Sequence, residues 1–125
     1  MAQKSLKDID PAYESLSEFS KVTKGTTALL QKMRQQAIYA EGAVPAKYKA
    51  MAAALWSVAV RCEPCIKYYV QQSVKNGATK EEIGGFLAVG STMGGCVGET
   101  WSLKAFKAFQ DLDDEQPKNE VGCCS

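Results

Sequence analysis

The feature that most constrains the fold of this chain is the stretch Cys62-Glu63-Pro64-Cys65, in which two residues separate two cysteines. Pro64 is typical of the first turn of a helix, where its missing N–H group costs nothing. No helix-breaking residue follows until Gly77. The pattern therefore predicts a helix that begins at this stretch, with both sulfurs on one face because helical residues three apart lie above one another.

The start of a helix changes the chemistry of two thiols. Free backbone N–H groups and the positive end of the helix dipole favour the thiolate over the thiol. The charge of Glu63 opposes this weakly, because a nearby anion raises the pKa of a thiol. We therefore interpret Cys62 and Cys65 as a dithiol that cycles with a disulfide. Spacing alone favours Cys62 as the attacking thiol, since it lies nearer the helix end.

Helix signals recur along the chain and predict an all-α fold of about six helices. The expected helices cover about residues 11–24, 26–40, 45–60, 63–76, a segment that starts at the Thr79–Glu82 capping box, and 98–112. The many glycines of that segment either permit close contact between backbones or mark a break near Gly94-Gly95. Leu29, Leu30 and Met33 are expected to face inward. The stretch 50–60 is apolar almost all round, which indicates a buried helix.

Composition sets broad limits on function. A length of 125 residues predicts one domain, here 1–112, followed by a polar, flexible tail at 113–125. A net charge of +1 gives no reason to expect nucleic acid as a partner, and the absence of a signal-like start or a membrane-length apolar run predicts a cytoplasmic protein without a membrane partner. Five cysteines then indicate redox or metal chemistry. The absence of histidine removes the commonest general base.

Three stretches together resemble a known family. They are Lys47 to Leu55, Ala59-Val60-Arg61-Cys62-x-x-Cys65-Ile66-x-Tyr68, and Asn76-Gly77-Ala78-Thr79-x-Glu81-Glu82-Ile83. In this combination the chain resembles the carboxymuconolactone decarboxylase and alkylhydroperoxidase D (AhpD)-like superfamily over about residues 12–112. The resemblance implies a helical subunit that assembles into trimers or hexamers. It also implies a thiol-dependent peroxidase or disulfide reductase without a cofactor, re-reduced by an external dithiol or a thioredoxin-like donor.

The chain departs from that family's pattern in its proton relay. The redox branch usually has a histidine four residues after the second cysteine, where this chain has Tyr69, and a glutamate twelve residues before the first, where it has Ala50. The family's attacking thiol corresponds to Cys65 and its resolving thiol to Cys62. This assignment conflicts with the choice from spacing, so both remain open.

Glu99 and Cys96 are candidates to replace the relay. They are three residues apart, hence on one face of a helix, and the resemblance places that helix near the cysteine pair. Glu99 would supply the missing carboxylate and Cys96 a third redox thiol. The alternative is that Cys96 is a small buried apolar residue and Glu99 an exposed or interface charge. Tyr69 either donates a hydrogen bond to a thiolate or only packs its ring, and a pKa near ~10 makes it a poor base.

Three functions remain open from the sequence. The first is a thiol–disulfide oxidoreductase or peroxidase. The second is a sensor or binding module in which Cys62, Cys65 and Cys96 hold a soft metal or metalloid, since thiolates suit such ions. The third is a structural homo-oligomer without catalysis. The tail pair Cys123-Cys124 is either inert or a mobile arm that passes electrons to the dithiol.

Overall fold

The computed structural model describes residues 4–114, and every regular element among them is a helix. Six α-helices and two short irregular helices follow one another. They are α1 (Leu6–Ile9), the 3-10 helix η1 (Pro11–Ser15), α2 (Leu16–Val22), α3 (Thr26–Arg34), the π-helix η2 (Gln35–Tyr39), α4 (Ala46–Ala59), α5 (Glu63–Lys75) and α6 (Lys80–Asp114). The predicted all-α fold is confirmed.

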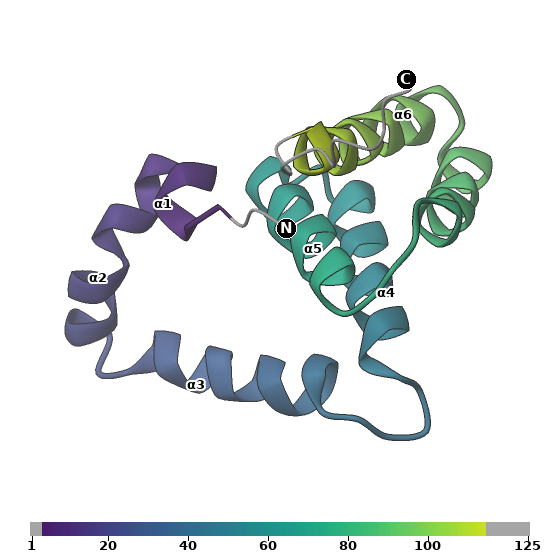
Figure 1. The fold of residues 1–125 in the computed structure, drawn as a ribbon. Coiled ribbons are helices and arrows are strands. Elements are labelled where there is room, and N and C mark those ends of the chain that lie inside the picture. The colour runs from purple at the N-terminus through teal and green to yellow at the C-terminus, as the bar shows by residue number, and fades with distance from the viewer. Residues whose placement is uncertain (1–3, 115–125) are drawn as a thin grey trace, which may run out of the picture.

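The helices form two parts, a body and an arm. Helices α4, α5 and α6 pack together as the body, while α1, α2 and α3 form an arm that loops out from it and returns (Figure 1). The core lies in the body. Its buried apolar residues are Met51, Ala54, Val58, Ile66, Val70, Ala78, Ile83, Leu87, Ala105 and Leu112. Helices α2 and α3 contain no buried residue.

Both ends of the arm are fastened to the body by hydrogen bonds. At its start, the Lys4 N–H donates to Gln71 Oε1 (2.8 Å) and Gln71 Nε2 donates to the Lys4 carbonyl (3.1 Å). At its end, Lys49 Nζ donates to the Ala40 carbonyl at 2.7 Å. Gln71 is buried, so these bonds satisfy a side-chain amide that would otherwise be costly to bury. Hydrogen bonds therefore hold the arm to the body at two points.

Two predictions about buried faces were wrong. Leu29, Leu30 and Met33 on α3 are 67%, 40% and 59% exposed, because α3 does not pack on the body. Helix α4 buries only the side that faces α5 and α6. Trp56 on its other side is 65% exposed and Val60, just past its end, is 47% exposed. A helix that is apolar all round thus presents one apolar face to solvent in the single chain.

Helix α6 is bent at Gly95, as the glycine pattern predicted. Gly95 adopts φ 62° and ψ −140°, a conformation that residues with a Cβ avoid. The bend folds the second half back, so that a Cβ at Gly98 would collide with the Gly90 carbonyl oxygen. The clustered glycines therefore permit close contact between backbones. No helix within residues 4–114 has the length and apolar character needed to cross a membrane.

Candidate redox site at the start of helix α5

A tight turn between α4 and α5 places Cys62. The Arg61 N–H donates to the Val58 carbonyl and the Cys62 N–H to the Ser57 carbonyl, both at 3.1 Å. This is the pattern of a helix C-terminus that closes with a left-handed residue, and Arg61 takes that position with φ 57°. Cys62 is the N-cap of α5 and Pro64 lies in its first turn. The predicted start of this helix is confirmed.

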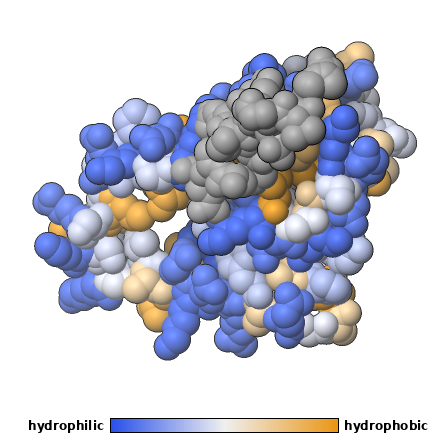
Figure 2. Space-filling view, viewed as in Figure 1, coloured by the Kyte–Doolittle hydropathy of each residue, from blue (hydrophilic) through white to orange (hydrophobic). Residues whose placement is uncertain are grey.

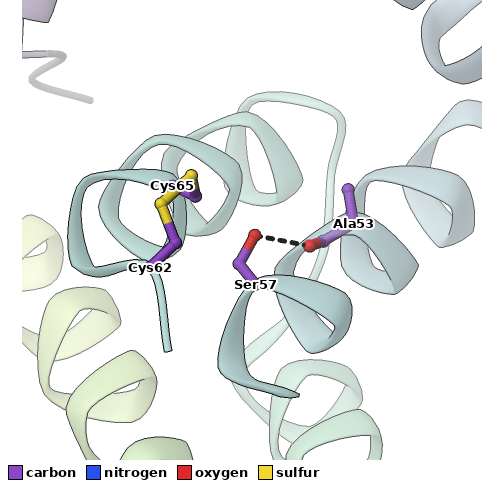
Figure 3. Close-up of a disulfide and its surroundings, with 4 residues drawn as sticks. All are labelled: Ala53, Ser57, Cys62 and Cys65. Carbon is purple, nitrogen blue, oxygen red and sulfur yellow. Dashed lines mark hydrogen bonds between the residues drawn. A yellow bond between two sulfur atoms is a disulfide. The ribbon is translucent and has the colours of Figure 1, made fainter. Parts of the chain in front are cut away.

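Cys62 and Cys65 form a disulfide across the first turn of α5. Their sulfurs are 2.08 Å apart and their Cα atoms 5.2 Å apart (Figure 3). Both residues are half-buried, so the bond is neither enclosed in the core nor fully in solvent. Ser57 of α4 lies beside the disulfide, and its hydroxyl donates to the Ala53 carbonyl at 2.8 Å. The predicted pairing of the two sulfurs at a helix start is confirmed.

Cys65 opens onto a cavity of about 470 Å³ between α5 and the arm. Figure 2 shows apolar residues on the side of the arm that faces the body, at the left of the view. Cys62 does not line this cavity. The residues that do are Leu6, Tyr13, Leu16, Ser20, Thr27, Ala28, Leu30, Gln31, Arg34, Cys65, Tyr68 and Tyr69. The two sulfurs are therefore not equivalent, because Cys65 lines the cavity and Cys62 does not.

Tyr69 at the cavity and the neighbouring Tyr39 are hydrogen-bond donors rather than bases. Burial raises the pKa of Tyr69, and the neighbouring Arg34 guanidinium opposes that rise. Burial also raises the pKa of Tyr39, and the nearby Tyr68 raises it further. The Tyr39 hydroxyl is buried without a hydrogen bond among the described residues. Raised pKa values keep these hydroxyls protonated at neutral pH, so none of them removes a proton from a thiol there.

The structure brings together only some of the residues that the sequence singled out. Tyr69 lines the cavity with Cys65. Cys96 and Glu99 are exposed on the second half of α6 and do not line it, and Cys96 is a free thiol. Within residues 4–114, no three Cys, Asp or Glu side chains gather where they would hold a metal ion, so Cys96 does not join the pair in a three-thiol site.

Position 50 and the tail pair Cys123-Cys124 are the other places that the sequence singled out. Ala50, where the redox branch usually carries a glutamate, is 0% exposed, so this chain has a buried methyl group where that branch has a carboxylate. Cys123 and Cys124 lie outside the described residues. Position 50 therefore carries no relay carboxylate, and Glu99 does not line the cavity in the single chain.

Sequence reasoning missed Arg34 as a residue of this site. It is half-buried, and its Nη1 lies 3.5 Å from Gln31 Oε1. Leu30 and Gln31 lie four and three residues before Arg34, so each is a neighbour of Arg34 on the surface of α3. That spacing shows a common face but not what the face covers. Arg34 lies at the same cavity as Cys65 only because the arm loops back toward the body.

Comparisons with known proteins agree with this fold. A protein of Legionella pneumophila, lpg0406, described as a carboxymuconolactone decarboxylase family protein and solved in its apo form, superposes with a TM-score of 0.77 at 28% identity, covering 86% of this chain and 96% of its own. The structure of TM1620 from Thermotoga maritima superposes with a TM-score of 0.69 at 26% identity, covering 86% of this chain and 95% of its own.

The sequence comparisons point to the same group. An uncharacterised protein of Cupriavidus necator is 30% identical over 73 residues, which span 58% of this chain and 65% of that relative, just under two thirds of its length. The family model of the carboxymuconolactone decarboxylases matches residues 25–108, which includes the disulfide, α4, α5 and most of α6. With this match over more than half of its length, the chain belongs to the carboxymuconolactone decarboxylase family.

Proposed function

We propose that this protein is a thiol–disulfide oxidoreductase that reduces peroxides with the dithiol of Cys62 and Cys65. The observation that carries the proposal is the disulfide itself, half-buried at the start of α5 with Cys65 facing a cavity. A buried structural cross-link has no need of such a cavity. Family membership is consistent with a redox role, and the fold places the sulfurs one helical turn apart.

The reaction runs through Cys65, since it is the sulfur that a small molecule in the cavity reaches. The Cys65 thiolate attacks the terminal peroxide oxygen, the O–O bond breaks, and the alcohol leaves with a proton while Cys65 becomes a sulfenic acid. The Cys62 thiolate then attacks that sulfur, and water leaves as the disulfide forms. An external dithiol, or a thioredoxin-like donor, returns two electrons and two protons.

Because the chain has no histidine, other groups must ionise Cys65 and donate a hydrogen bond to the leaving oxygen. Tyr69 stays protonated at neutral pH because burial raises its pKa. We therefore assign it the donation of a hydrogen bond to the peroxide oxygen that leaves, not the removal of a proton from Cys65. Ionisation of Cys65 relies instead on its place in the first turn of α5, where backbone N–H groups and the helix dipole favour an anion.

Thiol counting tests the proposal directly. Reduced protein, in a variant with Cys96 replaced by serine and the chain ended after Glu120, retains only the two thiols of Cys62 and Cys65. One equivalent of organic hydroperoxide is expected to remove both, to yield one alcohol, and to leave a disulfide that peptide mass mapping assigns to this pair. Dithiothreitol should restore both thiols. Thiols that stay reduced under excess hydroperoxide would contradict the proposal and leave a structural role.

The full-length chain tests the tail pair in the same assay. If Cys123-Cys124 passes electrons to the dithiol, ending the chain after Glu120 slows turnover with a thioredoxin-like donor but leaves the single oxidation by hydroperoxide unchanged. Equal turnover in both forms would reject that role for the tail.

We also propose that the protein acts as a homo-oligomer. Helix α4 and the two halves of α6 line an apolar groove of about 530 Å³, and Trp56, Met93 and Val97 at this groove are 65%, 82% and 53% exposed. Contiguous exposed apolar surface of this kind marks an interaction site. Leu29 and Met33 of α3 are further exposed apolar residues available to a second copy, in keeping with the trimer or hexamer that the family resemblance implies.

Met93→Asp is expected to shift the protein from an oligomer toward a single chain, because it places a charge in an interface that excludes water. Light scattering coupled to gel filtration measures the mass. Thr92→Asp is the matched control, since Thr92 is exposed next to Met93 but does not line the groove, and it should leave the mass unchanged. A wild-type protein that runs as a single chain would refute the oligomer.

A further inference from the structure

The cavity beside Cys65 contains one cation and no anion. Arg34 is the charged residue among those that line it, and the other lining residues are apolar or uncharged polar. Among the described residues Arg34 has no carboxylate partner, and the side chains near it are the amide of Gln31 and the phenols of Tyr69 and Tyr39. A half-buried guanidinium without a counter-ion favours an anion, above all a carboxylate, which it binds through two parallel N–H···O bonds.

The size of the cavity favours a small organic molecule. A volume of about 470 Å³ falls within the range of small-molecule sites, and a sphere of that volume is roughly 10 Å across. Hydrogen peroxide needs far less space. The volume therefore favours an occupant larger than hydrogen peroxide that fits within about 10 Å.

The walls of the cavity are mostly apolar and aromatic. The arm supplies Leu6, Leu16 and Leu30, and α5 supplies the rings of Tyr68 and Tyr69, which meet edge to face with centroids 5.1 Å apart. Such walls accept a hydrocarbon or aromatic group. A molecule that fits them has an apolar centre, a carboxylate at Arg34 and its reacting group at Cys65.

We propose that this cavity binds organic hydroperoxides that carry a carboxylate within about 10 Å of the peroxide group, with Arg34 holding the carboxylate. The inference rests on the proposed peroxidase function and specifies its substrate class. Cys65 takes the terminal peroxide oxygen and a hydroxy acid leaves. The cysteine pair becomes a disulfide with loss of water, and an external dithiol supplies the two electrons. Arg34 acts by binding and orientation and takes no part in bond breaking.

A matched pair of substrates tests the role of charge. Cumene hydroperoxide and its para-carboxylate share the same ring and the same peroxide, and differ only in the carboxylate. We expect the wild-type protein to use the carboxylate with a kcat/KM at least tenfold higher. Arg34→Gln should bring the two values together, and Arg34→Lys should keep part of the difference because it retains the charge but not the two-pronged geometry.

Lys32→Gln is the matched control for charge. Lys32 is exposed on the same helix and does not line the cavity, so its loss should leave the preference for the carboxylate intact. An equal loss of preference in Lys32→Gln and Arg34→Gln would show that net charge on α3, and not a bound carboxylate, makes the difference. That result would overturn the proposal.

Binding to the oxidised protein separates this inference from the proposed function. Calorimetry with 4-isopropylbenzoate and with 4-isopropylbenzyl alcohol needs no turnover. We expect the carboxylate to bind at least tenfold tighter than the alcohol, and Arg34→Gln to remove the difference. If binding follows this pattern while no hydroperoxide is reduced, the cavity assignment stands and the peroxidase function fails. If hydroperoxides are reduced but neither compound binds, the substrate class is wrong and the function stands.

Discussion

Replacing Cys65 with serine is expected to abolish peroxide reduction, with a loss of at least ~10³-fold in kcat/KM, because a serine hydroxyl does not ionise at neutral pH and is a far weaker nucleophile than a thiolate. Cys62→Ser should behave differently. Cys65 still attacks once in that variant, so one equivalent of alcohol appears in a rapid burst, and Cys65 then stays as a sulfenic acid because no resolving thiol follows. Stopped-flow measurement of alcohol release, together with dimedone labelling of the sulfenic acid, distinguishes the two variants.

The reverse pattern, a burst in Cys65→Ser and none in Cys62→Ser, would assign the attack to Cys62, which spacing alone favoured. Cys96→Ser and Glu99→Gln are the controls, because both residues are exposed on α6 and away from the lining of the cavity. We expect turnover in both to stay within about twofold of wild type, as is usual for exposed positions that touch no reacting group. A large loss in Glu99→Gln would restore the hypothesis that Glu99 is the relay carboxylate.

Gly98→Ala is expected to lower the free energy of unfolding by about 2 kcal/mol and the melting temperature by about 8 °C. A Cβ at this position would overlap the carbonyl oxygen of Gly90, which belongs to the backbone and has no rotamer to change. The two halves of α6 must then separate at the bend. The gain from replacing a helical glycine, up to ~1 kcal/mol, offsets only part of that cost. Urea unfolding followed by circular dichroism measures the change.

Gly85→Ala is the matched control on the same helix. Gly85 is exposed and a Cβ there meets no atom within 4 Å, so the substitution should raise stability by up to ~1 kcal/mol. Opposite signs for the two substitutions would establish that contact across the bend, and not glycine content, decides the outcome. A stabilised Gly98→Ala would mean that the halves of α6 do not pack as the structure has them.

Local signals in the sequence were enough to predict most helices. The capping box at Thr79 forms, with the Glu82 N–H donating to Thr79 Oγ1 at 3.1 Å and the Thr79 N–H to Glu82 Oε1 at 3.0 Å. The break at Gly95 and the start of α5 after Cys62 were likewise predicted, because glycine, proline and capping residues act within one turn. These signals fix where a helix begins and ends without reference to the rest of the chain.

The path of the arm could not be predicted from such signals. Leu29 and Met33 have the spacing of a core-facing stripe, yet they are exposed in the single chain. Spacing shows that side chains share a face but not whether the covering surface belongs to the same chain or to another copy. Arg34 was missed for the same reason, since its place at the cavity depends on a contact between residues far apart in the sequence. The replacement expected at Cys96 and Glu99 depended on the same kind of contact, and the structure does not bring them to the cavity.

The hydrogen bonds at Lys4 and at Ala40, which hold both ends of the arm, affect the entropy cost of binding a ligand in the cavity. A chain end that is free must lose conformational entropy each time it orders over a bound molecule, and that loss weakens affinity. Here the segment between the fastenings is already closed into a ring by hydrogen bonds at both ends, so most of its loop-closure entropy is lost when the protein folds. A ligand that binds in the cavity therefore does not have to order this segment again.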